Sequence, residues 1–185
     1  MRAYGQTDTG CVRTRNQDYI YFSPEQTGDL ENLFFLADGM GGYQAGDYAS
    51  WYAVEELVRY MKEQKGVPLV KRFQEGIAQV NSRLFQKAQN SFEYRGMGTT
   101  LVAASAQEQI MYVANVGDSR LYLFHGQKLS QVTKDHSYVE VLVAKGELER
   151  GSKDYQKQKN IITSLICGSI RITAILSRPP WSLAL

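Results

Sequence analysis

The sequence is poor in the residues that define several specialised protein classes. Its 185 residues include two cysteines and two histidines, and Cys11 and Cys167 are too few and too far apart for a disulfide scaffold or a zinc site. Positive and negative charges nearly cancel, with a net charge of +2. That balance implies neither a nucleic-acid-binding surface nor a disordered charged tail. These absences favour an ordinary globular protein, with the reduced cytoplasm as its simplest location.

Long apolar runs are also missing. The first ten residues, MRAYGQTDTG, lack the apolar core of a signal peptide. The apolar stretch near the end of the chain is interrupted by Arg171 and is too short to span a bilayer. The chain has no internal repeats and no low-complexity linker. Its length suits one domain, and we expect no contact with a membrane.

Hydrophobic periodicity predicts a chain of strands with two helices in the middle. Strands are expected at residues 2–8, 19–22, 33–37, 100–106, 110–116, 121–124 and 128–132. The first helix begins near Asp47, a residue type suited to an N-cap, and the second follows Pro68. Apolar residues recur every three or four positions in the second helix, which favours core packing over a binding groove. Gly126 and Gln127 are expected to form the turn before the last strand.

The most informative stretch is LFFLADGMGG, residues 33–42. Its apolar half is typical of a strand buried on both faces, and Asp38 stands where that strand is expected to end. The bare backbone of Gly39, Gly41 and Gly42 would let a metal, phosphate or substrate approach closely. An ordinary tight turn is the alternative, because Asp and Gly are also the commonest turn residues.

Four further motifs surround this stretch in the sequence. Arg13 and Asp18 delimit the first, RTRNQD, which combines guanidinium groups suited to phosphate with a carboxylate suited to a hard cation. The other three are GMGTT at 96–100, VANVGDSR at 113–120 and TKDHS at 133–137. We expect Asp18, Asp38 and Asp118 to converge at one edge of a sheet, with Arg13 beside them.

Five motifs in this order resemble those of the PPM-type metal-dependent protein phosphatases, the protein phosphatase type two C family, in its compact bacterial branch. They are VRTRNQD, ADGMGG, GMGTTL, NVGDSRLYLF and TKDHSYVEVLVAKGEL. The match runs from about Gln6 to about Thr163. The resemblance implies an α+β fold, a β-sandwich of two antiparallel sheets flanked by helix pairs in four layers and incomplete at the C-terminus. It also implies hydrolysis of phosphoserine and phosphothreonine in proteins by a metal-activated water.

The same resemblance assigns roles to individual residues. Asp38 would bridge two Mn²⁺ or Mg²⁺ ions, with the Gly39 carbonyl as a further ligand, and Asp18 would hold the metal shell directly or through water. Arg13 would position the phosphate, and Asp118 matches the aspartate of a third, weaker metal position. Two interpretations stay open beside these, namely that Arg13 is an ordinary surface arginine and that Asp118 belongs to a hairpin turn.

Two residues differ from those usual in the family, and two further features have no assigned catalytic role. Gln17 stands where the family usually has Glu, and Tyr43 where many bacterial members have a histidine that can donate a proton. The high reference pKa of tyrosine makes it a poor donor near neutrality. Asp135 is expected to cap a helix and to have no catalytic role. Residues 145–160 match the family's mobile flap, although their polar composition suits any surface element.

The largest departure is at the end of the chain. Residues 1–163 match the N-terminal two thirds of the phosphatase domain, whereas 164–185 match nothing in the family and contain no Asp or Glu. The family's two further metal-binding aspartates therefore cannot come from this tail, and we interpret it as a truncated or frameshifted ending. The second metal is then expected to bind weakly.

Two functions are consistent with this sequence. One is a phosphoprotein phosphatase whose partners are phosphorylated proteins, the substrates of a serine/threonine kinase, without nucleic acid or membrane and as a monomer. The alternative is a catalytically impaired fragment or a noncatalytic module that binds phosphoproteins or a kinase.

Overall fold

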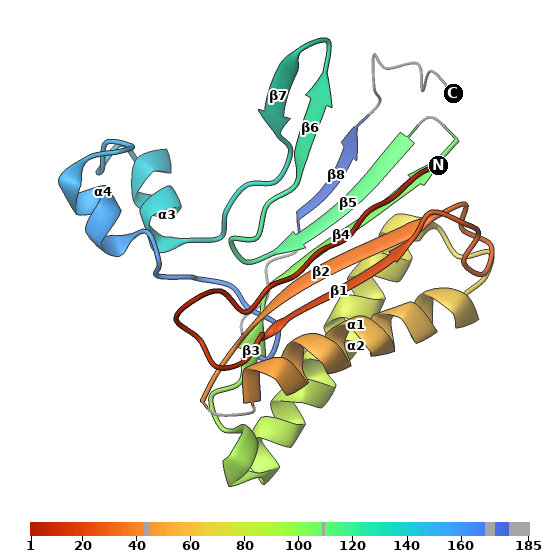
Figure 1. The fold of residues 1–185 in the computed structure, drawn as a ribbon, viewed down its shortest axis with the longest axis horizontal. Coiled ribbons are helices and arrows are strands. Elements are labelled where there is room, and N and C mark those ends of the chain that lie inside the picture. Colours follow the sequence, from red (N-terminus) through yellow and green to blue (C-terminus); the bar gives the residue numbers. More distant parts are fainter. Residues whose placement is uncertain (43–44, 109, 169–172, 178–185) are drawn as a thin grey trace.

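The computed structural model arranges the chain as an antiparallel sheet backed by two long helices (Figure 1). The structure describes residues 1–42, 45–108, 110–168 and 173–177. The strands of the main sheet lie in the order β1, β2, β4, β5, β8, and the short β3 also pairs with β2. The strands are β1 Asp18–Ser23, β2 Leu33–Met40, β3 Gly98–Thr99, β4 Leu101–Gln107, β5 Ile110–Val116, β6 Tyr122–His125, β7 Lys128–Gln131 and β8 Thr173–Ser177. The helices are α1 Ala45–Glu63, α2 Leu69–Asn90, the 3-10 turn η1 Phe92–Tyr94, α3 Tyr138–Ala144 and α4 Lys153–Gln158.

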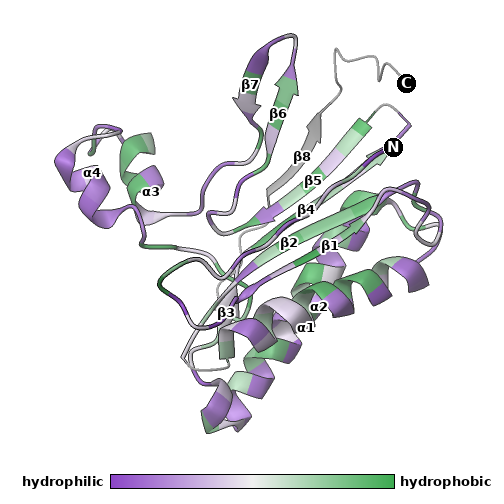
Figure 2. Ribbon diagram, in the orientation of Figure 1, coloured by the Kyte–Doolittle hydropathy of each residue, from purple (hydrophilic) through white to green (hydrophobic). Residues whose placement is uncertain are grey.

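The helices α1 and α2 cover one face of the sheet and turn their apolar residues towards it (Figure 2). Because side chains alternate along a strand, β2 shows the two faces directly. Leu33, Phe35 and Ala37 are buried, whereas Leu36 is 41% exposed on the opposite face. The prediction of a strand buried on both faces is therefore wrong for the face that carries Leu36.

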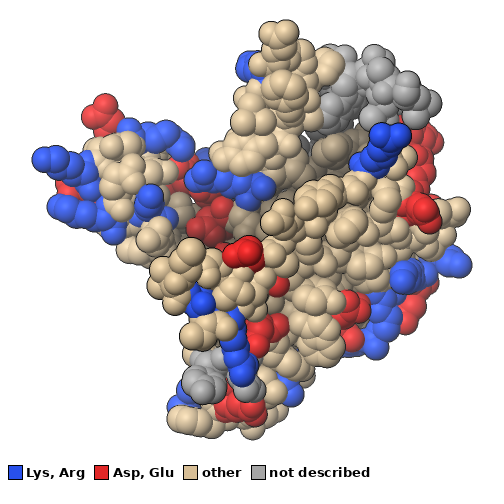
Figure 3. Space-filling view, viewed as in Figure 1, with Lys and Arg blue, Asp and Glu red and all other residues tan. Residues whose placement is uncertain are grey.

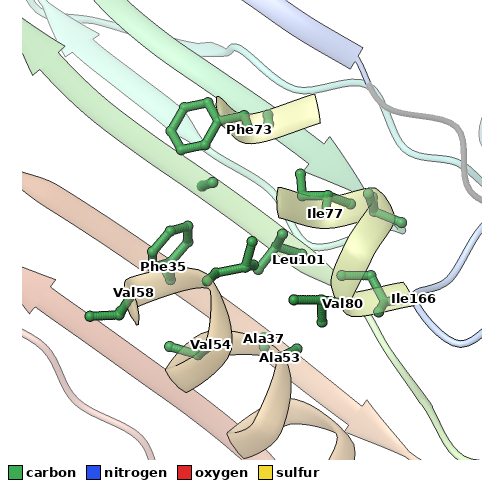
Figure 4. Close-up of a cluster of buried hydrophobic side chains, with 14 of the residues drawn as sticks. Phe35, Ala37, Ala53, Val54, Val58, Phe73, Ile77, Val80, Leu101 and Ile166 are labelled. Carbon is green, nitrogen blue, oxygen red and sulfur yellow. The ribbon is translucent and has the colours of Figure 1, made fainter. Parts of the chain in front are cut away.

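The core lies between this sheet and the helix pair (Figure 4). Val54 and Leu57 of α1, Phe73 and Ile77 of α2, and Leu101 of β4 are almost completely buried in it. The apolar stripe predicted for α2 thus packs against the sheet, as expected.

A second, two-stranded sheet consists of the hairpin β6–β7. Its turn residues Gly126 and Gln127 both have positive φ, 53° and 66°, which is typical of a two-residue hairpin turn. The predicted turn is confirmed. Beyond the hairpin, α3 and α4 form a small separate lobe (Figure 1).

Four predictions of secondary structure are wrong. Helix α1 begins at Ala45 and contains Asp47 within its first turn, so Asp47 does not cap it. Residues 2–8 form no strand. Strand β2 continues through Asp38 to Met40, because β3 pairs with Gly39 and Met40 and extends the ladder beyond the apolar run. Helix α3 begins at Tyr138 after Ser137, and Asp135 does not cap it because its carboxylate accepts hydrogen bonds from Arg120 instead.

The described residues beyond the predicted boundary at 163 pack with the rest of the fold. Ile166 is fully buried and exchanges two backbone hydrogen bonds with Thr99. Strand β8 pairs with β5 over its whole length. Tyr43, Arg171 and residues 178–185 lie outside the described residues. Among the helices of the described ranges, none has the length and apolar character needed to cross a bilayer.

Candidate active site

The centre of the candidate site is a pair of aspartates on neighbouring strands. Asp18 opens β1 and lies directly opposite Asp38 of β2 in the antiparallel register. Residues opposed in this way have Cβ atoms about 5 Å apart and point to the same face of the sheet. That face is the one without helices, and on it Asp18 is exposed whereas Asp38 is partly buried. The predicted proximity of Asp18 and Asp38 is confirmed, and their role as metal ligands stays a prediction.

Arg13 and Asp118 complete the electrostatic surroundings of this pair. Burial raises the pKa of the Asp38 carboxyl above its usual value, and the negative charge of Asp18 raises this pKa further. The positive charge of Arg13 acts in the opposite direction, and Asp118 adds a smaller repulsion. The four predicted residues are thus close enough to influence one carboxyl group, and they come from three different segments of the chain. Asp118 follows β5, and Arg13 lies in the exposed loop before β1.

The backbone of Asp38 is fixed by two buried threonines. The Asp38 amide donates to the Thr100 hydroxyl at 3.0 Å, and the Asp38 carbonyl accepts from the Thr100 amide and the Thr99 hydroxyl, each at 3.0 Å. Both threonines are completely buried. The motif GMGTT therefore supports the site from behind, although neither threonine is a predicted site residue.

Gly39 has a packing role that differs from the one expected. A Cβ atom at this position would lie 2.0 Å from the backbone oxygen of Gly46, so only glycine lets the first turn of α1 approach β2 so closely. Its amide also donates to the carbonyl of Gln17 at 2.9 Å, and the Ser50 hydroxyl donates to the same carbonyl at 2.7 Å. Gln17, the residue before β1 and the position where the family usually has Glu, is thus joined to both β2 and α1 through its carbonyl.

A second acidic pair lies on the other side of the site. Burial and the negative charge of Asp135 raise the pKa of Asp118. Asp135 is itself held by Arg120, whose Nη2 donates to Oδ2 at 2.6 Å and whose Nε donates to Oδ1 at 2.9 Å. The sequence predicts no catalytic role for Asp135, because its position next to His136 indicates only a helix cap. The motif GDSR contained Arg120, but nothing in the sequence showed which carboxylate it would bind.

A cavity of about 460 Å³ opens between α4 and the base of the hairpin. In the space-filling view a hollow separates the lobe of α3 and α4 from the body of the molecule, and acidic side chains lie in it (Figure 3). The cavity is lined by Asp118, Arg120, Asp135, Tyr155, Gln156, Lys159 and Asn160. The site therefore continues from the aspartate pair towards the lobe formed by the predicted flap.

The donor atoms of the aspartate pair suit a hard divalent cation. Within the described residues no three His, Cys, Asp or Glu side chains are grouped closely enough to hold one metal ion, so Asp18 and Asp38 are a pair rather than a complete cage. Their mutual repulsion is the physical sign that a positive charge would be favourable between them. Carboxylate oxygens are the ligands that Mg²⁺ and Mn²⁺ prefer.

The family model named protein phosphatase 2C matches residues 12–150, which contain every predicted site residue. The chain belongs to the protein phosphatase 2C family. Among its relatives, the protein phosphatase PhpP of Streptococcus pneumoniae is 40% identical over 166 residues, which cover 86% of this chain. The crystal structure of the serine/threonine phosphatase Stp1 from Staphylococcus aureus superposes with a TM-score of 0.81 at 35% identity and covers 93% of this chain. The α+β architecture with antiparallel sheets is thus that of protein phosphatase 2C structures.

The match covers only part of each protein phosphatase 2C relative. The chain spans 65% of the length of PhpP and 68% of the Stp1 chain. A third structure, the catalytic domain of the serine/threonine protein phosphatase PstP in complex with two manganese ions, superposes with a TM-score of 0.77 at 28% identity, and the match covers 93% of this chain and 70% of that one.

Proposed function

We propose that this chain carries the phosphate- and metal-binding part of a metal-dependent protein phosphatase that acts on phosphoserine and phosphothreonine. The observation that carries the proposal is the aspartate pair Asp18–Asp38 with Arg13 beside it, at the open face of the sheet. An anionic phosphate ester needs both charge neutralisation and a nucleophile available near neutral pH, and divalent metals supply both when bound.

Each residue of the proposed site has a defined task. Asp18 and Asp38 would hold Mn²⁺ or Mg²⁺, and their repulsion falls when a cation lies between them. The Gly39 carbonyl is the proposed further ligand. Asp118 belongs to the third, weaker metal position. Arg13 would bind and orient the phosphate through its guanidinium group, which matches phosphate oxygens in a two-point contact.

Hydrolysis of a phosphothreonine peptide by the 185-residue chain tests this proposal. We expect slow hydrolysis that depends on Mn²⁺, because the described site contributes few anionic ligands. Asp38→Ala should abolish it. Asp154→Ala is the matched control, since this exposed aspartate on α4 pairs with Lys157 and does not line the site. Hydrolysis that survives Asp38→Ala unchanged would contradict the proposal.

Binding without hydrolysis is the second candidate function, and the exposure of Arg13 favours it. An exposed guanidinium beside the aspartate pair can take up a phosphate group when no metal is present. In this case the chain binds the phosphothreonine peptide in EDTA, does not hydrolyse it with Mn²⁺, and loses about tenfold in affinity in Arg13→Ala. Fluorescence anisotropy of a labelled peptide separates the two functions.

The proposed partners are phosphorylated proteins made by a serine/threonine kinase, and we place the chain in the cytoplasm as a monomer. The two cysteines support a reducing location, because both are free thiols in the structure. Sedimentation of the purified chain in reducing buffer tests the monomer directly.

A further inference from the structure

The pairing between β2 and the GMGTT segment is interrupted at the position opposite Asp38. Strand β3 ends at Thr99 and β4 begins at Leu101, so Thr100 lies between two strands. In a regular antiparallel ladder, the carbonyl of the opposed residue would accept from the Asp38 amide. Here the Thr100 hydroxyl accepts from the Asp38 amide. The Thr100 carbonyl lies 3.0 Å from the Thr99 hydroxyl, whose single proton is shared with the Asp38 carbonyl. A side chain thus replaces the missing backbone acceptor.

The same hydroxyl also reaches the segment that carries Asp118. Thr100 Oγ1 lies 2.7 Å from the hydroxyl oxygen of Ser119. On its other side, the Thr100 methyl group packs against Gly117, where a Cβ atom would lie 2.7 Å from that methyl carbon. Thr100 therefore contacts the residues on both sides of Asp118 while it holds the amide of Asp38.

We infer that Thr100 is a positioning residue that fixes the Asp38 and Asp118 segments relative to each other through its hydroxyl group. Without this hydroxyl the Asp38 amide, in its partly buried position, would lose its acceptor, so the effect is expected at Asp38. Valine retains the methyl contact with Gly117 and removes the hydroxyl, whereas serine does the opposite. The two substitutions therefore separate the hydrogen bond from the packing contact.

Hydrogen exchange of the Asp38 amide, followed by NMR on the ¹⁵N-labelled chain, tests the inference without metal. We expect Thr100→Val to speed this exchange about tenfold, the change produced by the loss of one hydrogen bond. Thr100→Ser should stay within threefold of the wild type. Ser119→Ala leaves the bond to Asp38 in place and should also stay within threefold.

Ser105→Ala is the matched control for a lost buried hydroxyl. Ser105 lies on β4 as a completely buried residue, and its hydroxyl donates to the carbonyl of Asn32 rather than contacting the site. We expect it to lower the free energy of unfolding without changing Asp38 exchange. Equal effects of Thr100→Val and Ser105→Ala on Asp38, or a tenfold rise in Thr100→Ser, would overturn the inference. Should Thr100→Val not fold, the Thr100→Ser result decides alone.

The consequence for metal binding rests on the proposed function, and Mn²⁺ alone is the probe. By electron paramagnetic resonance we expect Thr100→Val to bind Mn²⁺ about tenfold more weakly and Thr100→Ser to match the wild type. Wild-type affinity in Thr100→Val would overturn the inference. If the wild-type chain binds no Mn²⁺, the proposed function fails, and the exchange experiment still decides whether Thr100 positions Asp38.

Discussion

The two faces of the main sheet differ in what covers them, and strand β2 contributes to both. On the helix side, Leu33 and Ala37 are fully buried beneath α1 and α2. On the other side lie Leu36, which is 41% exposed, and Asp38. One eight-residue strand thus supports the core with one set of side chains and the candidate site with the other. Stability and chemistry can therefore be altered separately in this fold, although the residues concerned are neighbours in sequence.

On the face covered by helices, the largest loss of stability is expected at the closest contact, the one between Gly39 and Gly46. Gly39→Ala places a methyl group 2.0 Å from the Gly46 oxygen, which neither backbone can avoid without separating α1 from β2. We expect a loss of about 4 kcal/mol in the free energy of unfolding, measured with urea. Gly42→Ala is the control, because a Cβ atom there meets nothing within 4 Å. Similar losses of stability in both variants would show that the contact with Gly46 is not the reason why residue 39 must be glycine.

Two leucines of β2 allow the two faces of the sheet to be compared with the same substitution, leucine to alanine. Leu33→Ala removes a completely buried side chain and should cost about 3 kcal/mol. Leu36→Ala removes a side chain that is already 41% exposed and should cost less than about 1 kcal/mol. Urea denaturation at pH 7 measures both. A cost for Leu36→Ala equal to that of Leu33→Ala would mean that the open face is covered in solution.

A smaller and opposite effect is expected for the acidic residue of the open face. The pKa of Asp38 is raised by burial and by Asp18, so the folded chain binds this proton more tightly than the unfolded chain does. The ionised form of Asp38 therefore lowers the free energy of unfolding. This loss develops as the pH rises from the ordinary aspartate pKa of about 3.9 through the raised pKa of Asp38. Asp38→Asn should stabilise the chain at pH 7, and this gain should disappear below about pH 4.

Asp29→Asn is the control for that experiment, because it should change the free energy of unfolding at pH 7 in the opposite direction. Two hydrogen bonds from Arg72 hold the pKa of Asp29 well below its usual range. Asp29 therefore contributes stability above the unfolded pKa, and this contribution is lost as the pH falls through the lowered value. We expect Asp29→Asn to destabilise at pH 7, because Arg72 is buried and loses its charged partner. Equal signs for the two variants would contradict the pKa directions.

The smallest effect should be seen at exposed apolar side chains of the open face. Phe22 is 45% exposed and lies on the same face as Leu36, where both line a groove of about 310 Å³. Leu36→Gln and Phe22→Gln together should reduce binding of an apolar dye and raise solubility, with little change in the free energy of unfolding. Unchanged dye fluorescence would place the accessible apolar surface elsewhere, for example on the hairpin residue Phe124.

The covered face could be predicted from the sequence, and much of the open face could not. The spacing of apolar residues predicts α2 and its buried stripe, because a helix buried on one face carries apolar residues every three or four positions. The end of β2 was missed because Gly39 and Met40 join the ladder through β3, a two-residue strand without an apolar pattern. The proximity of Asp18 and Asp38 could be predicted because each carboxylate stands beside a strand-like run in the sequence. The link between Arg120 and Asp135 could not be predicted, because it depends on folding across 15 residues and has no local signal.

The two free thiols give the chain a built-in means of selective labelling. Cys11 is exposed and lies two residues before Arg13, whereas Cys167 is partly buried, and burial raises the pKa of its thiol. Because the thiolate is the reactive form, a limiting amount of maleimide at neutral pH should attach a dye mainly at Cys11. The dye would then be located at the loop that carries the proposed phosphate ligand. Occupancy of the site could be followed in real time by fluorescence, with no engineered cysteine.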